Sequence, residues 1–263
     1  MDLKLKGKVA MVAASSKGLG YGIAQALAQE GSSISFGSRT HENIETSAEQ
    51  LRNETGVPVL ASVLDSSKPE SIRQWTDATL NEFGGVDKLV VNAGGPPTGK
   101  FEDFADEDWQ AAFDLNLFSA VRMIRATLPL MRKRGGGSIL TVTSMSVKEP
   151  IDVLILSNVM RSGVTSLVKS LSIQLAPDNI RLNNLMPGRI NTDRVRSLDA
   201  LNSEKQGVSI EQIQEVNHTN IPLGRYGTIE EFGRCGAFLL SDAASYVTGS
   251  SLAVDGGVLK TVW

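Results

Sequence analysis

Short apolar, β-branched runs alternate with longer segments of helical periodicity along almost the whole chain. The predicted strands cover residues 8–13, 33–37, 57–63, 88–91, 138–143, 181–186 and 251–254. The predicted helices cover residues 19–30, 42–54, 69–83, 106–134, 153–176 and 228–240. Strands that alternate with helices in this way form a parallel sheet with helices on both faces. Because the strands are apolar throughout, both of their faces are expected to be buried. We therefore expect an α/β fold with a doubly wound parallel sheet of seven strands.

Composition and charge narrow the classes to which the chain can belong. No linker or low-complexity tract divides the 263 residues, which predicts a single domain spanning residues 1–263. One cysteine rules out an intramolecular disulfide, and two isolated histidines predict no metal site. A net charge of −3 argues against a nucleic-acid-binding surface. No run approaches the roughly 18 apolar residues of a membrane helix, and the first residues lack a signal-peptide pattern. We expect a cytoplasmic protein with neither nucleic-acid nor membrane partners.

The segment from about 187 to 227 differs from the rest because it is polar and only weakly periodic. Forty residues without clear strands is long for a plain connection, so a lid with its own short helices is predicted. The alternative is a disordered surface excursion. Helical spacing of Ile210, Ile213 and Val216 favours the lid.

A glycine-rich turn follows the first predicted strand and leads directly into a helix. Its residues are Ser15, Ser16, Lys17, Gly18, Leu19 and Gly20. Glycines at such a turn allow close approach of a pyrophosphate, whose charge meets the amide groups of the helix N-terminus. The position after the first strand of an alternating pattern makes this a specific signal for a dinucleotide cofactor.

The end of the second predicted strand indicates which dinucleotide is bound. An acidic residue there would hydrogen-bond the ribose 2′-hydroxyl of NAD, but the chain has Ser38 and Arg39 instead. A hydroxyl and a guanidinium suit a 2′-phosphate, and Lys17 is expected to add a second positive charge nearby. The sequence therefore favours NADP(H). The alternative is that Arg39 and Lys17 are solvated surface charges.

Motifs along the chain resemble those of the short-chain dehydrogenase/reductase family, and 3-oxoacyl-acyl-carrier-protein reductases in particular. They are Asn92-Ala93-Gly94, Asn116, Ser144, Pro187-Gly188, and the C-terminal stretches 246–249 and 254–257. The resemblance spans nearly all of the chain and implies a Rossmann-type fold. It further implies a homotetramer or homodimer, and Ser162, Gly163 and Ser166 fit close packing of one helix against a partner subunit.

The same resemblance implies roles for further cofactor-binding residues. Asp65 would meet the adenine, and Asn92, Ala93 and Gly94 would line the adenosine ribose. Pro187, Gly188, Ile190 and Thr192 would hold the nicotinamide end. Ala14 stands where the family has its first glycine. A methyl group is tolerable there if φ is negative, so we expect a modest cost to binding.

The catalytic residues match the family only in part. Ser144, which would orient the carbonyl, and Asn116, which would anchor a water relay, are present. Ser157 and Arg161 replace the family's tyrosine and lysine, giving Ser-x-x-x-Arg on one face of a helix. Arg161 keeps the positive charge and can contact the ribose, but it cannot release a proton near neutral pH. Ser157 is a weaker acid than a phenol, but a water that it bridges could deliver the proton. The alternatives are His218 and Lys148 as substitute acids, although each is expected to be a surface residue.

Two functions follow from this partial match. The first is NADP(H)-dependent reduction of a ketone or 3-oxoacyl-type carbonyl with an atypical proton donor. Arg189, Arg194 and Arg196 in the predicted lid favour an anionic or extended substrate. The second is a redox-inactive NADP(H)-binding protein that acts as a sensor or assembly subunit.

Overall fold

Parallel β-strands form the centre of the structure, a computed structural model that describes residues 2–262. The strands within those residues are β1 (Val9–Ala13), β2 (Ser33–Ser38), β3 (Val59–Val63), β4 (Lys88–Val91), β5 (Gly137–Val142), β6 (Ile180–Pro187) and β7 (Ser251–Val254). They pair in the order β3-β2-β1-β4-β5-β6-β7, and every pairing is parallel. The predicted seven-stranded, doubly wound sheet is therefore confirmed for the described residues.

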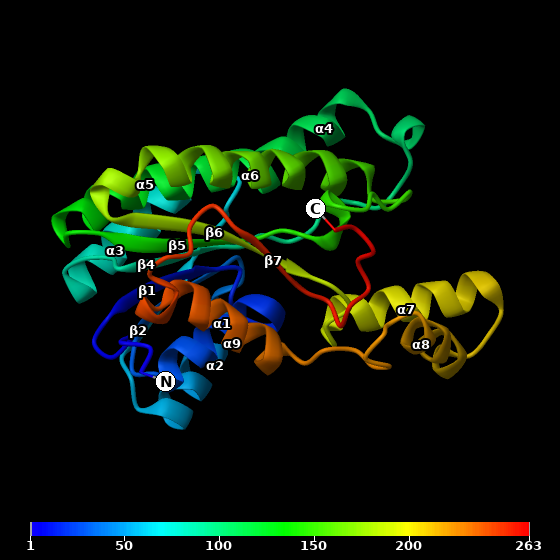
Figure 1. Cartoon of the computed structure of the whole chain (residues 1–263), viewed down its shortest axis with the longest axis horizontal. Coiled ribbons are helices and arrows are strands. Elements are labelled where there is room, and N and C mark those ends of the chain that lie inside the picture. Colours follow the sequence, from blue (N-terminus) through cyan, green and yellow to red (C-terminus); the bar gives the residue numbers. More distant parts are fainter. Residues whose placement is uncertain (1, 263) are drawn as a thin grey trace.

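Helices cover both faces of this sheet. They are α1 (Gly18–Gln29), α2 (His41–Thr55), α3 (Pro69–Phe83), α4 (Asp106–Ala112), α5 (Ser119–Lys133), α6 (Ile155–Gln174), α7 (Asp193–Gln206), α8 (Ile210–Thr219) and α9 (Ile229–Leu240). Helices α3, α5 and α6 lie on one face, and α1, α2 and α9 lie on the other (Figure 1). Strand β4 shows the consequence, because Val90 belongs to the apolar core under α1 and α9 while Leu89 belongs to the core under α3 and α5.

The strand order reverses between β1 and β4, and this reversal positions the site. The chain runs outward from β1 through β2 to β3, then returns to β4 on the other side of β1. Ligands of such sheets bind at the carboxyl ends of the strands beside the reversal. Helices α7 and α8 project beyond one end of the sheet (Figure 1). The segment expected to hold short helices does contain them.

The helical stretch predicted over residues 106–134 is confirmed in extent, since residues 106–133 are helical throughout, but it is not one regular α-helix. Helix α4 ends at Ala112, and a π-helical segment, Phe113–Phe118, connects it to α5. A π-helical turn adds a residue to the helical path and changes which side chains share a face, and such turns occur frequently at functional sites. Here the turn contains Asn116, whose side chain is buried.

Candidate active site

The glycine-rich loop between β1 and α1 is built to receive an anion. Helix α1 begins at Gly18, and the Lys17 side chain before it forms no capping hydrogen bond with the first turn. The amide groups of a helix's first turn lack partners within the helix and attract oxyanions. A Cβ on Gly20 would lie 2.5 Å from the Ala14 carbonyl oxygen, so the loop closes this tightly only with glycine there. These features fit the diphosphate of a dinucleotide.

The backbone of Ala14 does not have the negative φ that would make a methyl group tolerable in the loop. Its φ is +49°, in the left-handed region, so the expected negative φ is wrong. A non-glycine residue in that region costs about 1–3 kcal/mol. The conformation is held in part by Asn92, whose Nδ2 donates to the Ala14 carbonyl oxygen at 3.2 Å.

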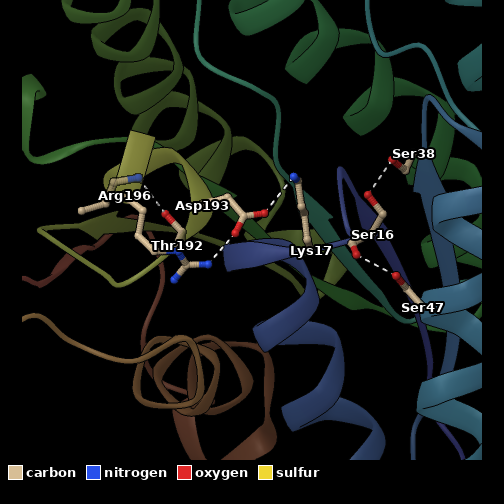
Figure 2. Close-up of polar contacts among 8 residues, drawn as sticks. Ser16, Lys17, Ser38, Ser47, Thr192, Asp193 and Arg196 are labelled. Atoms are coloured by element: carbon tan, nitrogen blue, oxygen red, sulfur yellow. Dashed lines mark hydrogen bonds and ion pairs between the residues drawn. The ribbon is translucent and has the colours of Figure 1, made fainter. Parts of the chain in front are cut away.

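Serine side chains connect the glycine-rich loop to the end of β2. Ser15 Oγ donates to the Val12 carbonyl oxygen at 2.7 Å, and the Ser16 and Ser38 hydroxyls lie 3.0 Å apart. Ser47 of α2 donates to the Ser16 carbonyl oxygen at 2.7 Å (Figure 2). Arg39, which follows Ser38, is exposed and has no carboxylate within 4 Å among residues 2–262. The Ser16 and Ser38 hydroxyls therefore lie together at the end of β2, where a 2′-phosphate was predicted, and the next residue is an arginine without an acidic partner.

Lys17 does not add its charge to this group. Its ammonium nitrogen lies 2.8 Å from Asp193 Oδ2 at the start of α7, on the side away from Ser38 (Figure 2). Hydrogen bonds from Lys17 and then Arg196 lower the pKa of Asp193. The predicted convergence of Lys17 and Arg39 is thus corrected, because Lys17 connects the glycine-rich loop to α7.

The outer cofactor residues are placed around the same edge of the sheet. Asp65, just after β3, accepts hydrogen bonds from the Ser67 hydroxyl at 2.7 Å and from its amide at 3.1 Å. These bonds, chiefly the one from the hydroxyl, and the charge of Lys68 lower the pKa of Asp65. Thr192 caps α7, and its methyl group lies 3.6 Å from the Cβ position of Gly18. Thr192 therefore faces the glycine-rich loop.

The residues between β6 and Thr192 contribute in different ways. Pro187 ends β6, and a Cβ on Gly188 would lie 2.5 Å from Asp255 Cα. The Ile190 side chain is buried in the apolar core, so only its backbone is available to a ligand. Its backbone pairs with Gly227 at the end of the 187–227 segment.

The turn after β4 joins the glycine-rich loop to the catalytic candidates. Asn92 donates to Ala14, as described above. The Ala93 carbonyl oxygen accepts a hydrogen bond from Arg161 Nη2 at 3.4 Å, and the Gly94 carbonyl oxygen accepts one from Asn116 Nδ2 at 2.8 Å. Asn116 is 5% exposed, and its Oδ1 has no hydrogen-bond partner among residues 2–262. A buried amide oxygen without a protein partner is suited to a water or a ligand.

The catalytic group consists of Asn116, Ser144, Ser157 and Arg161, and Arg161 carries its positive charge. Its Nε donates to Ser157 Oγ at 3.2 Å, and its Nη1 donates to the Val142 carbonyl oxygen at 2.9 Å. No carboxylate of the described chain lies within 4 Å of its guanidinium. Burial, and then the charge of Arg194, lower the pKa of Arg161 to about 10. It therefore remains a cation at neutral pH, without an acidic partner.

The serines of this group are positioned by different elements. Ser144 follows β5 and caps a short 3₁₀ turn, with its Oγ accepting from the Ser146 amide at 3.1 Å. Ser157 lies in the first turn of α6 and is 7% exposed. Because Ser157 Oγ accepts from Arg161, its own proton is free to be donated to another group.

The tyrosines are engaged elsewhere. Tyr21 stacks on Phe36 in the core, and burial raises its pKa to about 12. Tyr226 donates to Asp199 at 2.9 Å, and Tyr246 is fully exposed. None of these contacts leads to Ser144 or Ser157, so the structure offers no phenol in place of the missing one among the described residues.

Asp193 and Gly95 are site residues that sequence reasoning did not identify. Asp193 binds Lys17, and a Cβ on Gly95 would lie 2.6 Å from Arg194 Nη2. Each contact joins α7 to a loop far away in the sequence, and no local motif announces such a pair. Among residues 2–262, no cluster of His, Cys, Asp and Glu could hold a metal ion, and no helix has the length and apolar character of a bilayer crossing.

Known proteins resemble the chain over almost all of its length. A family model described as enoyl-(acyl carrier protein) reductase matches residues 13–259. Dehydrogenase/reductase SDR family member 4 of Oryctolagus cuniculus is 35% identical over 254 residues, covering 96% of this chain and 94% of that protein. The solved structure of L-sorbose reductase from Gluconobacter frateurii, complexed with NADPH and L-sorbose, is 33% identical with a TM-score of 0.96, covering 100% of both chains.

A further solved structure bears on the replaced catalytic residues. It is an NADPH-bound short-chain oxidoreductase from Pseudomonas aeruginosa PAO1 that is described as containing an atypical catalytic center. It is 29% identical to this chain, with a TM-score of 0.89, and covers 97% of this chain and 98% of its own.

Proposed function

Because this chain belongs to the short-chain dehydrogenase/reductase family, we propose that it reduces a ketone or 3-oxoacyl-type carbonyl to an alcohol with NADP(H). The observation that carries the proposal is the position of Arg161. Its guanidinium joins Ser157 to the backbone near the ends of β4 and β5, which supports a role for this cation in place of the family's lysine. Sorbose reductase and the P. aeruginosa oxidoreductase, both solved with NADPH, support the same cofactor here.

The chain's own residues fit this cofactor. The first turn of α1 would receive the diphosphate, and Ser16, Ser38 and Arg39 would receive the 2′-phosphate. Asp65, the turn 92–94 and residues 187–192 would hold the adenosine and nicotinamide ends. When bound, NADPH supplies the hydride, so that one ketone, one NADPH and one proton give one alcohol and one NADP⁺.

The catalytic residues would act on the carbonyl oxygen. Ser144 and Ser157 each carry a hydroxyl proton that can be donated to this oxygen, and the hydrogen bond that Ser157 Oγ accepts from Arg161 leaves the Ser157 proton available. Negative charge develops on the oxygen as the C=O π bond breaks, and the Arg161 cation stabilises it. A preorganised charge in a site shielded from water is commonly the largest contribution to catalysis.

The proton that completes the alcohol would come from water. Arg161 keeps its proton at neutral pH, with a pKa of about 10. The buried Oδ1 of Asn116 can hold a water, while its Nδ2 is fixed by the Gly94 carbonyl oxygen. A positioned general acid contributes roughly 10²–10⁴-fold, so a reductase with a water in this role is slowed but still active.

The remaining organisation completes the proposal. The 263 residues form one domain, with 187–227 as a lid over the substrate, in a cytoplasmic homotetramer or homodimer. Exposed Val159 and Ile173 on α6 support an interface there. Gly163 does not contribute to it as predicted, because a Cβ there would lie 3.0 Å from Leu117 Cδ2 of the same chain.

The decisive experiment is NADPH oxidation across oxoacyl thioesters, ketones and quinones, with the alcohol identified by mass spectrometry. Turnover with at least one carbonyl class is expected, and Ser144→Ala should lower it about 10–10²-fold by removing one donor to the oxygen. Absence of turnover with every class, in protein that binds NADPH, would overturn the proposal.

The second candidate is a redox-inactive NADP(H)-binding protein, and the replaced tyrosine and lysine favour it. The Ser157→Tyr/Arg161→Lys double variant separates the two functions. A large gain of reductase activity in an otherwise silent protein would establish the second candidate. Unchanged or reduced turnover of a native substrate would exclude it.

A further inference from the structure

Three arginines lie in and near the start of α7, and their contacts differ. Arg189 lies 3.6 Å from buried Asp199, which also accepts hydrogen bonds from Tyr226 and Asn217. Arg196 pairs with Asp193 and donates to Asn191 Oδ1 at 2.7 Å. Arg194 has no carboxylate within 4 Å among the residues that the structure describes. Of the arginines expected to meet an anionic substrate, only Arg194 retains an uncompensated charge.

Arg194 is directed toward the catalytic group. Its guanidinium lies against the backbone of Gly95, where a Cβ would be 2.6 Å from Nη2 and 2.8 Å from Cζ. Gly95 follows the turn whose Ala93 carbonyl oxygen accepts from Arg161. Glycine at 95 therefore permits the approach, and it brings a second guanidinium to the loop that already holds the first.

Both guanidiniums retain capacity for a ligand. Arg161 has five N–H donors, and its three hydrogen bonds go to neutral oxygen atoms. Burial is the larger cause of the lowered pKa of Arg161, and the positive charge of Arg194 lowers it further, so the two cations lie close enough to repel one another. A carboxylate bound by Arg194 would offset this repulsion and accept charge-assisted hydrogen bonds from the Arg194 guanidinium.

Helix α7 is held in position for such a role. Asp193, the residue before Arg194, is bound by Lys17 of the glycine-rich loop and by Arg196 (Figure 2). Asp193 is therefore engaged and does not neutralise Arg194. The same contact joins the first turn of α7, which holds Arg194, to the cofactor loop.

We propose that Arg194 forms a carboxylate-binding site beside the group that holds Arg161, so that the carbonyl substrate is an oxo acid whose carboxylate lies close to the ketone. This inference rests on the proposed reductase function and specifies its substrate class. Arg161 faces the ketone oxygen and Arg194 the carboxylate. A neutral ester of the same oxo acid keeps the ketone but loses the partner of Arg194.

The test compares short 2-oxo and 3-oxo acids with their methyl esters, in wild type, Arg194→Gln and Lys205→Gln. Lys205 lies in the last turn of α7 and provides the same change of charge on the same helix. Wild type is expected to have a kcat/KM at least 10-fold higher for the acid. Arg194→Gln should lower kcat/KM for the acid about 10–10²-fold and leave kcat/KM for the ester and the NADPH Kd unchanged. Lys205→Gln should leave kcat/KM unchanged for both substrates.

The outcomes separate this inference from the function on which it rests. Equal kcat/KM for acid and ester in wild type would overturn the carboxylate site while leaving the reductase intact. An equal loss on both substrates, or a weaker NADPH Kd in Arg194→Gln, would also overturn it. If neither substrate turns over, the carboxylate site is tested by the increase in the Tm of the NADPH complex on addition of the oxo acid. Stabilisation of wild type but not of Arg194→Gln supports the site, and its absence in wild type refutes it.

Discussion

The two halves of the candidate active site, the glycine-rich half and the catalytic half, differ in how their polar groups are satisfied. In the glycine-rich half, Ser15 donates to the backbone, Ser16 pairs with Ser38, and Asn92 closes the loop onto Ala14. In the catalytic half, Arg161 has no acidic partner and Asn116 keeps an unpaired buried oxygen. In the first half the side chains satisfy their hydrogen bonds within the protein. In the second half a positive charge and a hydrogen-bond acceptor have no protein partner and are available to a ligand. Changes of side chain should therefore affect binding modestly in the first half and turnover strongly in the second.

The largest effect is expected from Arg161→Met. The variant removes the cation that stabilises the developing oxyanion, so kcat/KM should fall about 10²–10⁴-fold, while loss of a ribose contact should raise the NADPH Kd by a smaller factor. Steady-state kinetics and fluorescence titration check both quantities. Arg161→Lys keeps the charge and should recover part of the loss. A Met variant that retains full activity would remove the distinction between the halves.

Lys88 is a buried cation that lies outside both halves, and it can be compared with the buried charge of Arg161. Lys88 is the first residue of β4, at the amino ends of the strands and opposite the candidate site, and is 5% exposed. Burial, and then the charge of Arg181, lower its pKa to about 8 from 10.5. The folded state therefore holds fewer protons than the unfolded state between about pH 8 and 10.5, and its stability rises with pH across that range.

Lys88→Met should accordingly stabilise the protein by about 2–3 kcal/mol at pH 7, because no buried charge remains. The advantage should shrink as the pH rises through 8 toward 10. Urea unfolding at several pH values measures it, and Lys6→Met at an exposed lysine is the control. A difference that does not vary with pH would show that Lys88 does not bear an unfavourable charge.

Arg39→Ala tests the glycine-rich half. Loss of one charge-assisted contact should raise the NADPH Kd about 10-fold and leave the NADH Kd nearly unchanged. Lys17→Ala should have a smaller effect on this preference because its ammonium binds Asp193. If Lys17→Ala has the larger effect, Lys17 leaves Asp193 for the 2′-phosphate when the cofactor binds.

The smallest effect is expected at Ala14. Ala14→Gly relieves the positive φ and should stabilise the fold by up to about 1 kcal/mol, after the greater freedom of glycine in the unfolded chain is deducted. For a chain of this size, this corresponds to about 2–4 °C in Tm. Buried Ala13 in β1 is the matched position, and Ala13→Gly should destabilise. Opposite signs at the two positions would establish the strain at Ala14.

Sequence patterns predicted the layers of the fold and the location of the glycine-rich loop because both depend on local periodicity and on glycine. They failed where tertiary contacts decide. The π-helical turn at Phe113–Phe118 keeps an apolar helical pattern, so nothing in the spacing marks it. The direction of Lys17 depends on Asp193, which only the folded chain brings near. The positive φ of Ala14 likewise follows from closure of the loop onto Asn92 and Gly20.

The sequence predicted which residues belong to the catalytic group, but it did not predict most of the hydrogen bonds that these residues form. The Ser157–Arg161 contact follows from their spacing on one helix. The second and third hydrogen bonds of Arg161 go to backbone oxygens of separate strands, which no helical pattern specifies. Arg194 was one of three candidates in the sequence, and only the structure separates it from the two arginines that have acidic partners.

The most direct test of the account is transfer of deuterium from NADPH labelled at C4 to an oxo acid, followed by mass spectrometry of the product. The account predicts one deuterium on the carbinol carbon with wild type, and a rate of transfer about 10²–10⁴-fold lower with Arg161→Met. No transferred deuterium in wild type that binds NADPH, or an undiminished rate in Arg161→Met, would contradict it.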